Sequence, residues 1–80
     1  MLDPGTICRS RDIIIRCKDE EKGRLCRIMK VVPEARWRTA GVAEYKVELI
    51  ALPVTAFRRE TELMPIAPSE LTASITSLVA

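Results

Sequence analysis

The chain has 80 residues, of which 48% are hydrophobic and 30% are charged, with a formal net charge of +2. This composition indicates one small globular domain and excludes a generally disordered chain. The charge is well below that of a dedicated nucleic-acid-binding protein, although residues 1–38 carry ten basic side chains against six acidic ones.

The first third of the chain predicts two short strands. Pro4 and Gly5 form a turn signal, and residues 6–9 then read as a strand. The next strand is expected over residues 13–17, which are dense in β-branched side chains. Residues 18–23 form a polar connection that ends in Gly23, a residue that can adopt a positive φ.

Residues 24–32 fit two kinds of structure. Leu25, Ile28, Met29 and Val32 follow helical spacing, so the pattern by itself permits an amphipathic helix. We expect a strand instead, because glycine opens the segment, two valines close it, and the following Pro33 disfavours helical backbone at the residue before it.

The middle of the chain predicts a hairpin. Residues 33–42 form a long connection that contains Trp37, and residues 44–52 read as the next strand. In that strand Tyr45, Val47 and Leu49 point to one face, and Lys46 and Glu48 point to the other. The strands over residues 24–32 and 44–52 should pair in antiparallel fashion, with Trp37 near the tip of the hairpin.

The last part of the chain predicts the closing elements. Residues 54–57 read as a short strand, residues 58–62 as a turn or one turn of 3₁₀ helix, and residues 63–66 as a final strand whose Pro65 requires an edge position. Ser69 is a good N-cap, and an apolar stripe at helical spacing follows it. We expect residues 68–80 to form a C-terminal amphipathic helix or tail.

The whole pattern resembles that of SH3-like small barrels, including the KOW group. The resemblance rests on Pro4-Gly5-Thr6-Ile7, on Lys22-Gly23 with Leu25, Ile28 and Val31, on Tyr45-Lys46-Val47-Glu48, and on Phe57 through Ile66. It implies an all-β fold over residues 1–67, a small SH3-like barrel of about five antiparallel strands, with Gly23 as the KOW glycine. KOW proteins bind RNA or other proteins, so the resemblance implies a binding module.

The residue types present argue against catalysis and against a metal centre. The chain has no histidine, and its three cysteines, Cys8, Cys17 and Cys26, lie too far apart for the usual zinc spacing. We therefore expect no enzyme activity and no cofactor, and we expect the cysteines to act as small buried hydrophobic residues. An odd cysteine count, no signal peptide and no apolar run of membrane-spanning length predict a reducing, cytoplasmic setting.

Two binding hypotheses remain open. The first is a self-associating protein-interaction module, because a thin core, an apolar C-terminal stripe and the Arg36-Trp37-Arg38 loop all favour a protein partner. The alternative is RNA binding, in which Arg24, Arg27 and Lys30 contact phosphates and Trp37 stacks on a base. Trp37 has a third possible role, as a lid folded back onto its own barrel.

Overall fold

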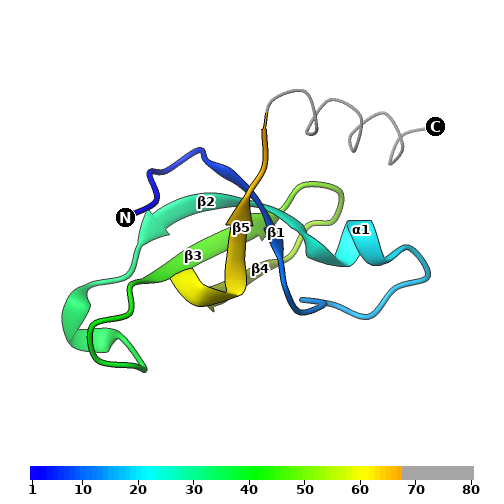
Figure 1. Cartoon of the computed structure of the whole chain (residues 1–80). Helices are drawn as coiled ribbons and strands as arrows, with labels where there is room; N and C mark the ends of the chain where they lie inside the picture. The colour runs from blue at the N-terminus through cyan, green and yellow to red at the C-terminus, as the bar shows by residue number, and fades with distance from the viewer. Residues whose placement is uncertain (68–80) are drawn as a thin grey trace.

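The computed structural model describes residues 1–67 (Figure 1). Its elements in chain order are β1 (Ile7–Ser10), α1 (Glu20–Arg24), β2 (Leu25–Val31), η1 (Glu34–Arg36), β3 (Glu44–Leu49), β4 (Thr55–Arg59), η2 (Glu60–Glu62) and β5 (Leu63–Pro65). The C-terminal helix or tail expected over residues 68–80 lies outside the described residues. Within residues 1–67, no helix has the length and apolar character needed to cross a membrane.

Five antiparallel strands form a single sheet in the order β4-β3-β2-β1-β5. The two edge strands, β4 and β5, are joined by the three-residue turn η2, so the sheet has to curl until its ends approach each other (Figure 1). Pro65 lies on the edge strand β5, as its missing N–H requires. The predicted all-β fold is confirmed, and the resemblance to SH3-like barrels stays a prediction.

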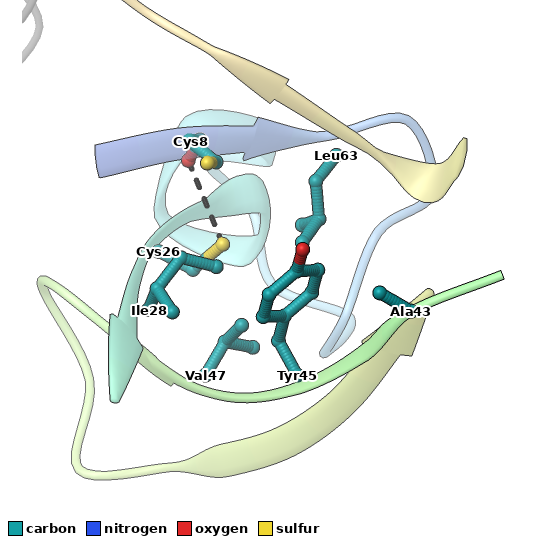
Figure 2. Packing of buried hydrophobic residues seen from close by; sticks show 7 residues of the cluster. All are labelled: Cys8, Cys26, Ile28, Ala43, Tyr45, Val47 and Leu63. Carbon is teal, nitrogen blue, oxygen red and sulfur yellow. Dashed lines mark hydrogen bonds between the residues drawn. The ribbon is translucent and has the colours of Figure 1, made fainter. Parts of the chain in front are cut away.

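The core lies on the concave side of the curled sheet (Figure 2). The side chains that form it come from β1, β2, β3, β5 and the residue before β3: Cys8, Cys26, Ile28, Ala43, Tyr45, Val47 and Leu63. Tyr45 is fully buried, and its hydroxyl accepts a hydrogen bond from the Leu2 N–H at 2.8 Å and donates to Glu60 Oε1 at 3.2 Å. One ring therefore connects the N-terminal segment, β3 and η2.

The hairpin of β2 and β3 confirms the strand assignment for the ambiguous segment. Residues 25–31 form β2 and pair with β3 in antiparallel fashion, and the loop that contains Trp37 connects the two strands. Tyr45, Val47 and Leu49 are buried while Lys46 and Glu48 are partly exposed, as the alternation predicts. Strand β3 ends at Leu49, three residues earlier than expected, because residues 50–53 turn toward β4.

The predicted strand over residues 13–17 is wrong. Strand β1 already pairs with β2 on one side and with β5 on the other, so the residues that follow it cannot pair alongside β1. They form an irregular loop instead, which the Ile14 N–H fixes by donating to the Gly23 carbonyl at 2.7 Å. High β propensity does not produce a strand by itself, and residues 13–17 pair with none of the five strands.

The polar connection before β2 is also different from the prediction, because it forms the short helix α1. Asp19 caps this helix by accepting a hydrogen bond from the Glu21 N–H at 3.0 Å. Gly23 lies within α1 and has no positive φ. Its lack of a side chain serves close packing instead, since a Cβ at this position would lie 2.5 Å from the Ile15 carbonyl oxygen and 2.9 Å from Ile13 Cγ2.

We expect Gly23→Ala to destabilise the protein by about 1–3 kcal/mol, because the new methyl group must push the loop away from α1. This cost exceeds the roughly 1 kcal/mol that alanine gains over glycine in helix propensity. Urea denaturation measures the change in the free energy of unfolding. Lys22→Ala on the same helix is the matched control, and a Gly23→Ala variant as stable as the parent would contradict the packing role of this glycine.

Candidate functional site

Trp37 does not present its ring as an open binding surface. The side chain is partly buried against the core cluster, and its indole N–H donates to the Val32 carbonyl at 2.7 Å. This hydrogen bond holds the ring across the base of its own loop. Of the three roles considered for Trp37, the structure supports the lid, and neighbouring Arg36 stays exposed on η1.

Arg38 belongs to a cluster of charges that fixes the same loop to the sheet. Its Nε donates to the buried Glu44 carboxylate at 2.7 Å, and its guanidinium lies 3.5 Å from Glu62. Glu62 also accepts the Arg59 backbone N–H at 2.8 Å. Burial by itself would raise the pKa of Glu62, but the hydrogen bonds and charge of Arg59 outweigh it and hold that pKa below its ordinary value. Arg38 therefore has a structural role.

We call the side of β2, β3 and β4 that points away from the core the outer face, and its side chains are accessible to a partner. Lys46 lies directly opposite Lys30 on β2 and directly opposite Phe57 on β4. These residues form a row, Lys30–Lys46–Phe57, across three strands. Phe57 is 51% exposed although it is a large apolar residue.

Both lysines of this row lack a compensating charge. Within residues 1–67, neither Lys30 nor Lys46 makes a salt bridge. Like charges directly opposite each other on neighbouring strands destabilise a sheet. A register irregularity between Ile28 and Lys30 leaves Met29, which is 40% exposed, beside this row. The outer face thus combines unpaired positive charge with exposed apolar area.

A groove of about 560 Å³ lies beside Arg27 and Glu48, the cross-strand pair next to the row on the outer face. Its polar wall is Arg27 with Glu48, which form an ion pair across β2 and β3 on the outer face. Its apolar wall comes from β1 and from the turn before β4, and consists of Ile7, Ile50, Ala51, Leu52 and Pro53. An extended segment that lies across the outer face could therefore contact both the groove and the lysine row.

The basic residues that the sequence predicted as phosphate contacts lie in two different places in the structure. Arg27 and Lys30 lie on the outer face, but Arg24 lies on α1 and pairs with Glu20 at 3.5 Å. Sequence reasoning missed Lys46 and Phe57 as site residues. The alternation of β3 showed that Lys46 faces away from the core, but only the register between strands shows that Phe57 and Lys30 flank it.

The cysteines form no metal site. Cys8 and Cys26 are buried opposite each other on β1 and β2, and the Cys26 thiol points to the Cys8 carbonyl at 3.5 Å (Figure 2). Burial raises the pKa of Cys8 to about 11 and that of Cys26 to about 12. Cys17 is exposed, contrary to the expectation that all three are buried. Among residues 1–67, no group of three or more His, Cys, Asp or Glu side chains could hold a metal ion.

Comparison with known proteins found no matching family model, no similar curated protein and no similar solved structure.

We expect one fast-reacting thiol in the folded protein at pH 8. Cys17 should react readily with a thiol reagent, whereas Cys8 and Cys26 should react at least about a hundredfold more slowly, because burial both blocks access and suppresses the thiolate. Mass spectrometry of the labelled protein counts the modified sites over time. Labelling in denaturant should reach all three cysteines, and fast labelling of Cys26 in the folded protein would contradict the described core.

Proposed function

We propose that this chain is a small non-catalytic protein-binding module whose outer face holds a partner segment rich in acidic and apolar residues. The observation that carries the proposal is the Lys30–Lys46–Phe57 row. Two facing lysines that make no salt bridge within residues 1–67 lower the stability of the sheet, and an acidic partner side chain placed between them offsets that cost. The odd cysteine count supports a reducing, cytoplasmic setting for the module.

The chemistry of the outer face favours a protein ligand. Phe57 and Met29 supply exposed apolar area beside the lysines, and the groove extends that area toward the turn that precedes β4. Aromatic residues and methionine are enriched in protein interfaces. Charge complementarity then sets which partners bind: negatively charged segments are attracted, and positively charged ones are repelled.

The sheet edges are less suited to binding a partner strand. On edge strand β4, the Arg58 guanidinium donates to the Phe57 carbonyl at 2.8 Å, and the Glu62 carboxylate accepts the Arg59 N–H at 2.8 Å. On the other edge, Pro65 has no N–H to offer. These backbone groups are either hydrogen-bonded to side chains or absent, so they cannot pair with a partner strand. The face of the sheet is therefore a better docking surface than its edges.

The test uses a synthetic peptide of alternating glutamate and leucine, titrated into ¹⁵N-labelled protein. We expect chemical-shift changes to concentrate at Lys30, Lys46 and Phe57. The double variant Lys46→Ala, Phe57→Ala should weaken binding by roughly tenfold or more, since an interface aromatic and a complementary charge are removed together. Arg36→Ala, an exposed residue on η1, is the matched control and should leave the affinity unchanged.

The alternative, RNA binding, is favoured by one feature of the same row, because an exposed aromatic ring beside two lysines can stack on a base. A single-stranded oligouridine 12-mer titrated under the same conditions separates the two functions. RNA binding at the row with a steep loss of affinity as salt rises, and no binding of the peptide, would replace the protein-binding proposal. If neither the peptide nor the RNA binds at the outer face, both the protein-binding and the RNA-binding functions are overturned.

We also propose that the module self-associates, and this proposal has its own measurement. Light scattering coupled to size exclusion should give a mass above the 9.0 kDa of one chain. Removal of residues 69–80 should lower that mass if the apolar stripe of this segment mediates association. A mass of one chain for both proteins would contradict self-association through this segment, and it would leave the outer face open to an unlike partner.

A further inference from the structure

A second pocket, of about 540 Å³, lies between the loop after β1 and helix α1. Four basic side chains line it, namely Arg11, Arg16, Lys18 and Arg24, and they face only two acidic ones, Asp12 and Glu20. Ile13, whose side chain is exposed, and Cys17 also line the pocket. Because α1 precedes β2 and the Trp37 loop follows it, this pocket lies at the opposite end of β2 from that loop (Figure 1).

The positive charges of this pocket are mostly unpaired. Glu20 pairs with Arg24 at 3.5 Å. Within residues 1–67, Arg11, Arg16 and Lys18 make neither a salt bridge nor a side-chain hydrogen bond. Three cations held around one pocket repel each other, so their free energy falls when an anion enters.

One polar atom of a residue that lines the pocket also lacks a hydrogen-bond acceptor. The Nε of Arg24 is buried, and it has no partner within the described part of the chain. A buried N–H of a guanidinium is costly to leave without an acceptor. Arginine and lysine side chains together suit the oxygens of a phosphate group, so an anion with several negatively charged oxygens fits the cations around the pocket. The same anion gives the Arg24 N–H an acceptor once the side chain turns this atom toward the pocket.

We propose that this pocket is a binding site for a multiply charged phosphate group, separate from the outer face. Arg16 and Lys18 contact the group from the loop, and Arg24 contacts it from α1. The loop can converge on α1 because Gly23 permits their close approach, as the Ile14 N–H bond to the Gly23 carbonyl shows. The ligand is a pyrophosphate-like anion, either free or as the phosphorylated headgroup of a lipid.

The experiment uses the full chain and inorganic pyrophosphate as the probe. We expect pyrophosphate to shift the amide signals of residues 11–18 and to slow modification of Cys17 by the uncharged reagent N-ethylmaleimide, since Cys17 lines the pocket. The variant Arg16→Ala, Lys18→Ala should weaken pyrophosphate binding by roughly tenfold or more, because two charge-assisted contacts are lost. Its thermal stability should match the parent, as neither side chain has a partner in the described part of the chain.

Two controls decide the result. Lys30→Ala, Lys46→Ala removes the same amount of charge from the outer face and should leave pyrophosphate binding unchanged. Sodium acetate at matched ionic strength should not protect Cys17. If both double variants weaken pyrophosphate binding equally, the binding reflects general attraction of charge and the proposed site is overturned. The site is also overturned if the protein binds neither pyrophosphate nor vesicles that contain phosphatidylinositol bisphosphate. Binding to these vesicles alone assigns the lipid source, and binding to pyrophosphate assigns the free anion.

Discussion

The buried ring of Tyr45 is the contact on which the rest of the structure depends. The core contains one fully buried aromatic side chain, and its hydroxyl bonds to Leu2 on one side and Glu60 on the other. Burial is the main cause that raises the pKa of this phenol, so the hydroxyl keeps its proton and can donate to Glu60. Because Glu60 begins η2, the ring also fixes the turn that brings β4 and β5, the two ends of the sheet, toward each other.

The pairing of β2 with β3 determines the chemistry of the outer face. Arg27 lies opposite Glu48 and the two neutralise each other. After the irregularity at Met29, the register brings Lys30 opposite Lys46, and neither lysine makes a salt bridge with any residue from 1 to 67. A sheet selected only for stability would favour opposite charges at this position, since facing lysines cost free energy. The same register places Phe57 next to Lys46, which joins charge and apolar area on one surface.

Sequence reasoning predicted the elements whose signals are local and missed those that depend on partners. The alternation of β3 and the edge position of Pro65 follow from single residues, and the structure confirms both. Residues 13–17 have strong β propensity but pair with none of the five strands, an outcome that no local pattern reveals. Gly23 was expected to give conformational freedom, yet its function is to let a loop lie within van der Waals distance of a helix. The Lys30–Lys46–Phe57 row required the register of two strand pairs, so sequence alone could supply only Lys30.

The small net charge of the chain conceals how its charges are distributed. Arg38 and Arg59 are held by Glu44 and Glu62, and Arg27 is held by Glu48, so these guanidinium groups support the fold. Arg27 and Arg38 belong to residues 1–38 and pair with acidic residues of the second half, which offsets two of the four excess positive charges in the first half. The cations left without an acidic partner in the described part of the chain include those of two separate places, the lysine row on the outer face and the pocket beside α1. Each place combines that charge with exposed apolar side chains, Phe57 and Met29 at the row and Ile13 at the pocket, and both proposals rest on this combination. A basic residue in this chain is therefore informative about function only once its partner, or the lack of one, is known.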